Sequence, residues 1–410
     1  MQLQPSSRER ELIDLAGRLA RKRFAPRAER HDREASFPFD DYADLRAEGL
    51  LGLCVPERYG GLGADFETYC LVAEQIAQGN ASTALTFNMH CLVMLMMGPI
   101  ADGMAMAPAV RERHEQLRAV KYREVIEQGA FYGQPHSEPV EHGETDTTLA
   151  VGGRRFGTTA RKVDGGYVVN GRKFFVSLAD SAPHYATPAI RLGDEPWIER
   201  TLYLKVPKDA PGVSFPGDWD PMGMRATVSR DMVLDNVFVP DDAEVLPPGV
   251  FGAMYNAFPH LFITFSAVFL GLAQAAYDGA ISYMTGQLPG APAQHPGAKG
   301  PAVAEMLFAV EAARALYYRA ISEAQVDPPR DIVQRARAAH VTVQRTVVGV
   351  TQEAIRICGG RAFLKRYPLE RYARDARAAA LMRPWTEELA VQQAWQAALG
   401  QDAAPVGTTA

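Results

Sequence analysis

The feature that most constrains the fold is a change of residue pattern in the middle of the chain. Between about residues 130 and 246, β-branched and aromatic residues are interrupted by glycine-containing turns, as in DGGYVVNGRKFFVSL and DMVLDNVFVP. Before and after this region, apolar residues recur at three- and four-residue spacing, as in ERELIDLAGRLARKRF. These patterns predict helices, then strands, then helices again. The expected fold class is α+β, mainly α.

The changes of pattern also set the expected boundaries. We expect an all-α N-terminal domain at 1–129, an antiparallel β-barrel or sandwich at 130–246, a four-helix-type bundle at 247–400 and a disordered tail at 401–410. Long helices are expected at roughly 254–286, 302–326, 329–357 and 368–382. Hairpin-type signals stand at Asp164-Gly165-Gly166 and Asn170-Gly171. Strands and helices do not alternate, which disfavours a doubly wound nucleotide-binding sheet.

Charge and cysteine content limit the expected partners. The formal net charge is −5 at pH 7, and there are four cysteines. This net charge shows no excess of basic residues that would indicate binding to nucleic acid or an anionic membrane. A small molecule is therefore the expected ligand. The cysteines form no CxxC pair, which is typical of a reducing compartment, and the start has no apolar signal segment. We therefore expect a cytoplasmic protein.

One segment is apolar enough to suggest a membrane span. Residues 251–277 contain no Asp, Glu, Lys or Arg, and this length can cross a bilayer. Pro259 and His260 argue against that interpretation. A core helix, hydrophobic on all sides, is the better prediction.

Local patterns disfavour two kinds of chemistry. The nine histidines are scattered without a site-like spacing to other ligands, so no metal site is expected. No GxSxG elbow exists, and Ser137 and Ser177 lack neighbouring bases, which disfavours hydrolysis by a triad. His90, in FNMHCLVMLMM, is either a hydrogen-bonded core residue or a pocket residue. The methionines around it either pack the core or line an apolar substrate cavity.

Six stretches of the chain form a recognisable series. They are GLLGLCVPERYGGLGAD (49–65), HSEP followed by GETD (136–146), DGGYVVNGRKFFVSLAD (164–180), GMRATVSRDMVLDNVFVP (223–240), GLAQAAYDGAISY (271–283) and GGRAFLKRYPLERYARDAR (359–377). In content and order they resemble the acyl-CoA dehydrogenase superfamily, and the resemblance covers nearly the whole chain. It implies an oxidoreductase that holds FAD between the β domain and the C-terminal bundle.

The resemblance also implies flavin-contacting residues. Gln134, His136 and Ser137 stand on the family's flavin-contacting strand, where Ser137 keeps the hydroxyl of the usual threonine. Phe175 and Ser177 match the family's Trp-x-Thr pair, an aromatic cover and a hydroxyl. Such groups suit a flat apolar ring edged with donors and acceptors. The alternatives are an inward-facing strand residue for Phe175 and a turn hydroxyl for Ser177.

Two departures concern the dinucleotide half of FAD. The family's Arg-x-x-Phe-Gly loop is replaced here by QLPGAPAQHPGAKG (287–300). Arg356 either replaces the lost positive charge or merely favours the end of its helix. Weak FAD retention is therefore expected. In the family, the pair matching Gly359 and Gly360 meets a neighbour's FAD, which implies a homo-oligomer, either a tetramer or a dimer.

The family's usual catalytic glutamate is absent. Aligning the RDA motif places residues 382–385, MRPW, in its position. Arg383 and Trp385 are therefore expected in the substrate pocket with His90. Arg383 cannot act as the base, because its guanidinium stays protonated.

Glu387 is the nearest carboxylate that follows this position. It lies one helical turn beyond Arg383, and we predict it as a relocated catalytic base. The alternative is that Glu387 and Glu388 are first-turn acids that favour the helix dipole.

Three functions remain open from the sequence. The first is an FAD-dependent dehydrogenase of an acyl thioester, carried by CoA or a carrier protein. The second is a flavin-dependent monooxygenase, in which reduced flavin reacts with oxygen and no α-proton base is needed. In that case His90 and Ser177 are candidate pocket residues. The third is a non-catalytic binding or scaffold protein.

Overall fold

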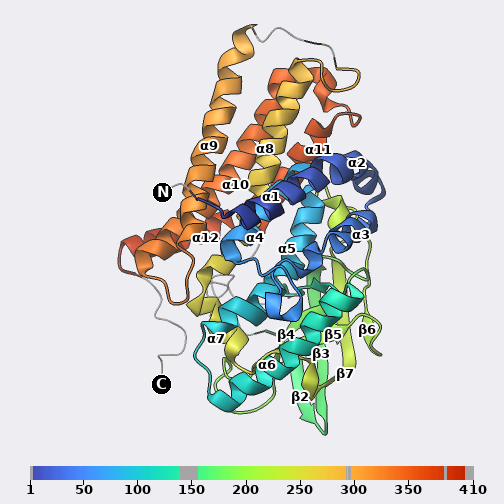
Figure 1. Cartoon of the computed structure of the whole chain (residues 1–410), viewed down its shortest axis with the longest axis vertical. Helices are drawn as coiled ribbons and strands as arrows, with labels where there is room; N and C mark the ends of the chain where they lie inside the picture. Colours follow the sequence, from blue (N-terminus) through green and yellow to red (C-terminus); the bar gives the residue numbers. More distant parts are fainter. Residues whose placement is uncertain (1–2, 139–155, 292, 294–296, 383–385, 402–410) are drawn as a thin grey trace.

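The chain folds in the expected order of helices, strands and helices (Figure 1). The computed structural model describes residues 3–138, 156–291, 293, 297–382 and 386–401. The predicted fold class, mainly helical with a central sheet, is confirmed.

The N-terminal unit consists of helices, and the first turns of α1, α4 and α5 are capped by side chains. Its α-helices are α1 (Ser7–Leu19), α2 (Ala25–Glu34), α3 (Phe39–Ala47), α4 (Phe66–Gly79), α5 (Ala81–Leu95) and α6 (Pro108–Arg123). Asp65 caps α4 by accepting from Thr68 N at 2.8 Å, and Asn80 caps α5 by accepting from Ser82 N at 3.1 Å. Every residue of α5 is buried, which explains why this helix has no charged residue.

The strands form one mixed sheet. They are β1 (Tyr132–Gly133), β2 (Thr159–Val163), β3 (Gly166–Val176), β4 (His184–Arg191), β5 (Thr201–Pro207), β6 (Val213–Ser214), β7 (Arg230–Pro240) and β8 (Glu244–Leu246). Their order is β6-β7-β3-β2-β4-β5-β8, and β1 pairs with β4. The expected antiparallel pairing is wrong for β1–β4 and β2–β4, which are parallel. Neither pair is consecutive in the chain, so no tight turn forces these strands to be antiparallel.

The two hairpin signals have different outcomes. Asp164 and Gly165 form the turn between β2 and β3, and Gly165 has the positive φ, 72°, that such a turn favours. Asn170 and Gly171 instead lie inside β3, at an irregularity against β7. A Cβ on Gly171 would lie 2.3 Å from Thr158 Oγ1. Glycine is therefore required there for close approach, and the prediction of a turn was wrong.

The C-terminal unit is helical again. Its α-helices are α7 (Val250–Ala257), α8 (Thr264–Met284), α9 (Gly300–Ser322), α10 (Arg330–Cys358), α11 (Pro368–Asp375) and α12 (Glu387–Ala398). The helix expected at 254–286 is broken at Pro259, which begins a 3-10 turn. The helix expected at 368–382 is α-helical only to Asp375, and a 3-10 segment follows to Leu381. In Figure 1, α8, α9 and α10 form the upper part of the molecule and the strands form the lower part.

Two stretches are long and apolar enough to cross a membrane, Ala81–Ile100 and Pro259–Met284. Of their most apolar windows, 94% and 89% of the residues are buried inside the protein. At Gly271, a Cβ would lie 2.2 Å from Glu74 O, so the backbone of α8 lies directly against α4. The stretch expected to be a core helix therefore packs as one.

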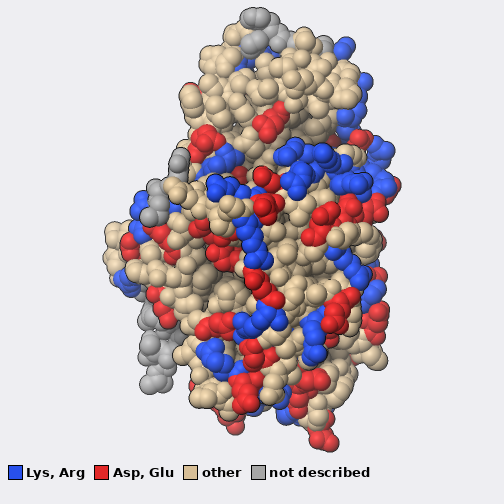
Figure 2. All heavy atoms as spheres, in the orientation of Figure 1, with Lys and Arg blue, Asp and Glu red and all other residues tan. Residues whose placement is uncertain are grey.

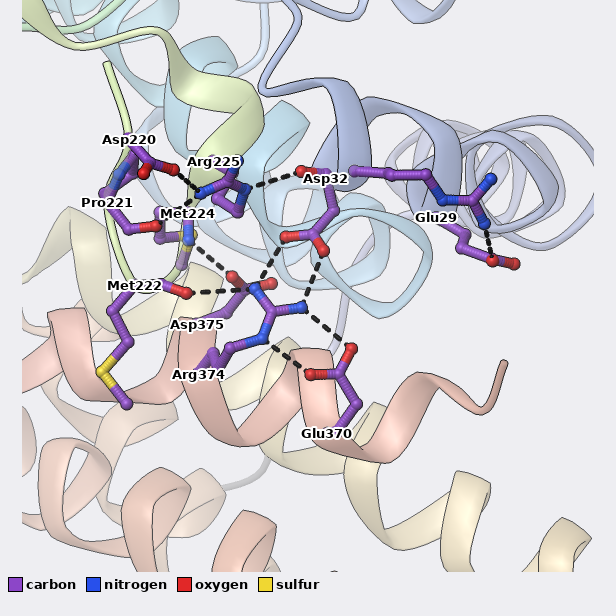
Figure 3. A network of polar contacts seen from close by, with 11 residues as sticks. Glu29, Asp32, Asp220, Pro221, Met222, Met224, Arg225, Glu370, Arg374 and Asp375 are labelled. Carbon is purple, nitrogen blue, oxygen red and sulfur yellow. Dashed lines mark hydrogen bonds and ion pairs between the residues drawn. The ribbon is translucent and has the colours of Figure 1, made fainter. Parts of the chain in front are cut away.

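One guanidinium joins all three units (Figure 3). Arg374 of α11 donates from Nη1 and Nη2 to Asp32 of α2 at 2.9 and 2.7 Å, and from Nε and Nη2 to Glu370 at 2.7 and 2.9 Å. Nη1 also donates to Met222 O at 3.0 Å, in the loop before β7. All five N–H groups are thus engaged. Burial opposes the charge, but the hydrogen bonds to Glu370 and Asp32 raise the pKa of Arg374 above its ordinary value.

The same loop is held by two further side chains. Asp375 Oδ1 accepts from Met224 N at 2.5 Å, and Arg225 donates to Asp32 O at 2.8 Å and to Asp220 Oδ1 at 2.6 Å. Met224 has a φ of 52°, a left-handed conformation that costs a non-glycine residue about 1 kcal/mol or more. The loop therefore depends on charged groups of both helical units (Figure 3).

We predict that Arg374→Ala lowers the free energy of unfolding by roughly 3 kcal/mol, because it leaves Asp32 and Glu370 without their partner. Chemical denaturation of the purified variant measures this change. The matched control is Arg33→Ala, which removes a surface ion pair with Glu29 whose side chains are 68% and 49% exposed, and it should cost less than about 1 kcal/mol. Equal losses for the two variants would contradict a special role for Arg374.

We predict that Asp375 makes the protein less stable as the pH rises from about 4 to 6. Burial raises the pKa of Asp375 to about 6, against an ordinary value of 3.8, although Arg371 and Arg374 oppose the shift. The folded state therefore binds the proton more tightly than the unfolded state, and ionisation reduces stability until pH exceeds the folded pKa. Asp375→Asn removes this dependence. Denaturation curves of both proteins across this range test it, and a stability difference that stays constant contradicts it.

Candidate functional site

A cavity of about 630 Å³ lies between the N-terminal helices, the sheet and the C-terminal helices. One wall is an apolar stripe formed by Leu85, Met89 and Leu92 of α5 and by Met96, the residue that follows this helix. Their spacing of three and four residues places them on one face of the helix. Further apolar residues face the cavity from the C-terminal unit, among them Leu261, Phe262, Phe265, Ala378, Leu381 and Met382. The cavity is therefore suited to an apolar ligand body.

The sheet supplies the polar wall. Gln134, His136 and Ser137, which follow β1, line the cavity together with Phe175 and Ser177 at the end of β3. The sequence predicted all five as flavin-contacting residues, and the fold brings them together. Gln134 Nε2 donates to Met89 O at 2.8 Å, which ties this wall to α5.

Phe175 fits a flat aromatic ligand. Its side chain lines the cavity but is 73% exposed, and its φ of 48° turns it out of the regular path of the strand. A large exposed phenyl ring at a cavity suits a stacking partner, and a flavin ring is such a partner. The residues present therefore fit a flavin.

His136 is held neutral. Its Nδ1 lies 2.9 Å from Tyr255 Oη, and its Nε2 lies 3.3 Å from Tyr203 Oη. Burial, together with the charge of Lys173, lowers the pKa of His136 to about 3. Near pH 7 this residue therefore orients neighbours by hydrogen bonding and carries no charge.

Glu138 is the one acidic side chain among the described lining residues. Its carboxylate forms an ion pair with Lys173, and Oε1 accepts from Thr158 N at 3.1 Å and from Thr158 Oγ1 at 2.6 Å. Burial would raise the pKa of Glu138, but Lys173 and these hydrogen bonds hold it below its ordinary value. Glu138 is therefore a structural anion and a poor proton acceptor.

Three hydroxyls lie together on the cavity wall. Ser177 Oγ is 2.9 Å from Ser229 Oγ, which is 2.8 Å from Thr227 Oγ1. Thr227 and Ser229 belong to the loop that Arg374 and Asp375 hold. These two residues carry no signal in the sequence, because only the pairing of β3 with β7 brings them to Ser177.

Arg377 is the cation available to a ligand. It lines the cavity, is exposed, and has no hydrogen bond or ion pair to any other residue that the structure describes. Arg374 also lines the cavity, but all of its N–H groups are engaged. An anionic group of a ligand would therefore pair with Arg377.

His90 is not a pocket residue. Its Nε2 lies 2.7 Å from Leu51 O, its side chain is fully buried, and it does not line the cavity. Burial lowers the pKa of His90 to about 4. The structure gives no support to a pocket role, because His90 projects from α5 outside the stripe that contains Met89. The alternative, a core histidine, describes its position.

Glu387 does not line the cavity. It begins α12, where Thr386 caps the helix, and its carboxylate accepts from Arg345 Nε at 2.8 Å. This position matches the alternative of a first-turn acid and gives no support to a catalytic role. Arg383 and Trp385, the other predicted pocket residues, lie outside the described residues.

The predicted dinucleotide contacts lie on the surface. Arg356 is exposed and pairs with Glu353, three residues earlier on α10. Gly359 and Gly360 have no atom within 4 Å of where a Cβ would lie. None of these three residues lines the cavity. Among the described residues, no group of three or more His, Cys, Asp or Glu side chains could hold a metal ion.

Comparison with known proteins agrees with this geometry. Family models of the acyl-CoA dehydrogenases match the chain with the N-terminal domain at residues 6–102, the middle domain at 145–237 and the C-terminal domain at 263–383. YdbM of Bacillus subtilis (strain 168), named as a candidate acyl-CoA dehydrogenase, is 30% identical over 91% of this chain and 93% of its own.

Other relatives carry different names. The amino sugar nitrososynthase DnmZ of Streptomyces peucetius is 32% identical over 96% of this chain and 94% of its own. The structure of KijD3 in complex with FMN and dTDP-3-amino-2,3,6-trideoxy-4-keto-3-methyl-D-glucose has a TM-score of 0.79 and 27% identity, and covers 98% of this chain and 96% of its own. With its flavin-compatible cavity, the chain is a flavin oxidoreductase that belongs to the acyl-CoA dehydrogenase family.

Proposed function

We propose that the protein is a flavin-dependent monooxygenase. One observation carries this proposal: of the cavity-lining residues that the structure describes, only Glu138 is acidic, and Lys173 and Thr158 already bind its carboxylate. Desaturation of an acyl thioester requires a free base close to the α-carbon. Oxygenation requires no such base. When bound, reduced flavin supplies the two electrons that activate molecular oxygen.

The proposed substrate is a small molecule that carries a neutral amine. DnmZ is named for an amino sugar, and KijD3 binds an amino sugar linked to dTDP. An amine is a nucleophile only when it is unprotonated. Arg377 has no partner among the described residues and Glu138 is already engaged, and this combination disfavours an ammonium group in the cavity. Arg377 also suits a phosphate or carboxylate elsewhere on the substrate.

Each wall of the cavity has its own task in this function. Phe175 stacks on a flat ring, and the apolar stripe of α5 excludes water. His136, held between Tyr203 and Tyr255, keeps its wall uncharged. Ser137, Ser177 and the neighbouring hydroxyls supply hydrogen bonds to the polar edge of a ring.

The form of the flavin is part of the proposal. FAD was expected from the family resemblance, with Arg356 compensating for a missing loop arginine. Arg356 is bound to Glu353 on the surface, so a mononucleotide suits this chain as well as FAD does. KijD3 binds FMN. The mononucleotide is therefore the first flavin to test, and FAD is the second.

An acyl thioester dehydrogenase is the second candidate. The similarity to YdbM favours it, and the stripe formed by Leu85, Met89, Leu92 and Met96 would suit an acyl chain. The base predicted for it from the sequence, Glu387, would first need a rearrangement that breaks the ion pair with Arg345. This requirement ranks it below oxygenation.

Exposed rings on the surface support a homo-oligomer, either a tetramer or a dimer, and the buried cysteines support a place in the cytoplasm. In Figure 2, basic and acidic side chains are interspersed over much of the visible face, whereas the upper end, at the tips of α8 and α9, is mostly uncharged. Phe308 and Phe363 are 61% and 74% exposed. Large exposed rings suit contact with another subunit. All four cysteines are buried, and buried thiols suit a reducing compartment.

We predict that FMN-loaded protein, reduced without oxygen and then mixed with oxygen and an amino sugar, yields a product heavier by one oxygen atom. Mass spectrometry of the products checks this result. A panel of acyl thioesters, added to the oxidised protein without oxygen, should leave the flavin absorbance unchanged. If a thioester bleached the flavin absorbance, the result would favour the acyl thioester dehydrogenase. Failure of the protein to bind any flavin would contradict both candidates.

We predict that Glu387→Gln changes neither oxygen transfer nor flavin binding by more than about twofold, since Glu387 lies outside the cavity wall and its loss removes one half-exposed ion pair. Product formation by variant and wild type is compared at the same flavin loading. Removal of a general base lowers the rate of product formation by roughly 100-fold or more. A loss of that size would support Glu387 as the relocated base. Arg345→Ala, which breaks the same ion pair, controls for structural effects.

A further inference from the structure

The hydroxyls of Ser177, Ser229 and Thr227 form a chain that ends at a carbonyl. Ser177 Oγ is 2.9 Å from Ser229 Oγ, Ser229 Oγ is 2.8 Å from Thr227 Oγ1, and Thr227 Oγ1 is 2.9 Å from Met224 O. The three side chains line the cavity and are 8%, 7% and 1% exposed. We call this group the hydroxyl relay.

Counting protons fixes the direction of the relay. Three contacts join the four oxygens, and three hydroxyl protons are available. Met224 O has no proton to give, so Thr227 donates to it. Ser229 must then donate to Thr227, and Ser177 to Ser229. In the reverse direction Thr227 would donate to Ser229. Thr227 Oγ1 and Met224 O would then face each other at 2.9 Å with only lone pairs between them. Met224 O also accepts from Thr227 N at 3.0 Å, which a carbonyl with two lone pairs permits.

The relay therefore presents only acceptors to the cavity. Ser177 has used its proton and retains two lone pairs, while Ser229 and Thr227 retain one each. No other described residue donates to Ser177 Oγ. A ligand edge that meets these oxygens must bring an N–H or O–H donor, because two acceptors facing each other in a buried site cost free energy.

We propose that Thr227 and Ser229 fix the Ser177 hydroxyl as an acceptor and so make the cavity favour the reduced form of the flavin. This inference rests on the proposed flavin function. N5 of the oxidised ring is an acceptor. A hydride donor such as a reduced nicotinamide would supply two electrons and the hydrogen at N5, and N5–H would then be a donor. Where N5 of a bound ring meets Ser177, the reduced ring would gain a hydrogen bond that the oxidised ring lacks.

The arrangement makes Ser229 and Thr227 positioning residues. Neither needs to touch the ring, since each acts by using the proton of its neighbour. In Ser229→Ala the proton of Ser177 has no acceptor in the relay and is free to point into the cavity. In Thr227→Val, Ser229 donates back to Ser177 with the same result. Both variants should therefore strengthen binding of the oxidised ring, while the free hydroxyl of Ser177 can still accept from the reduced ring.

The test compares dissociation constants of oxidised FMN and dithionite-reduced FMN, the latter measured without oxygen. Wild type should bind reduced FMN more tightly by roughly tenfold. Ser229→Ala and Thr227→Val should each bring the ratio of the two constants close to one. Ser181→Ala is the control, since Ser181 bonds to Ala179 O at 3.3 Å and does not line the cavity, and its ratio should match wild type.

A structural defect would weaken both forms of FMN together and leave their ratio unchanged, and thermal unfolding checks that each variant is folded. Equal affinity of wild type for the two forms of FMN overturns the inference. This result is expected if the relay meets N3–H, which is a donor in both forms, instead of N5. A ratio unaffected by both relay variants also overturns it. In either case flavin still binds and the proposed oxygenation stands. If neither form binds, both proposals fail.

Discussion

The guanidinium of Arg374 is the interaction on which the rest of the structure depends. Its five N–H groups reach Asp32 in the N-terminal helices, Met222 in the loop before β7, and Glu370 one turn earlier in its own helix (Figure 3). These partners are far apart in the sequence. The attraction between charges is stronger in a partly buried ion pair than in a surface pair. It offsets the cost of desolvation only when the charged groups are fully hydrogen-bonded. Arg374 meets this condition, and it joins the three units beside the cavity that it lines.

The electrostatics of the cavity follow from the pairing of its charged groups with other groups of the protein. Glu138 and Lys173 neutralise each other beneath the sheet wall, and His136 is neutral because burial and Lys173 both oppose its protonation. What remains for a ligand is a set of hydroxyls and the single cation of Arg377 among the described lining residues. Such a site favours hydrogen-bond recognition and an anionic group. It gives little support to proton abstraction, which needs a free base.

The sequence predicted the fold well because its information is local. Helical and strand periodicities are visible in short windows, and they located all three units. Gln134 and Ser177 were identified through the family resemblance. His90 was misplaced because α5 is apolar on every side, so no polar face indicates which residues meet the cavity. Glu387 was placed by assuming one helical turn after Arg383, whereas α12 begins only at Glu387, with Thr386 as its cap.

Long-range geometry explains what the sequence could not reveal. Thr227 and Ser229 reach Ser177 only because β3 pairs with β7 and because Met224 and Val228 adopt left-handed backbone conformations. Arg374 and Asp375 hold that loop through Met222 O and Met224 N. Met224 O is also the acceptor at the end of the hydroxyl relay. The contacts that close the three units therefore also hold the carbonyl that sets the direction of the relay. It follows that domain closure and the hydrogen-bonding polarity of the cavity are physically coupled in this chain.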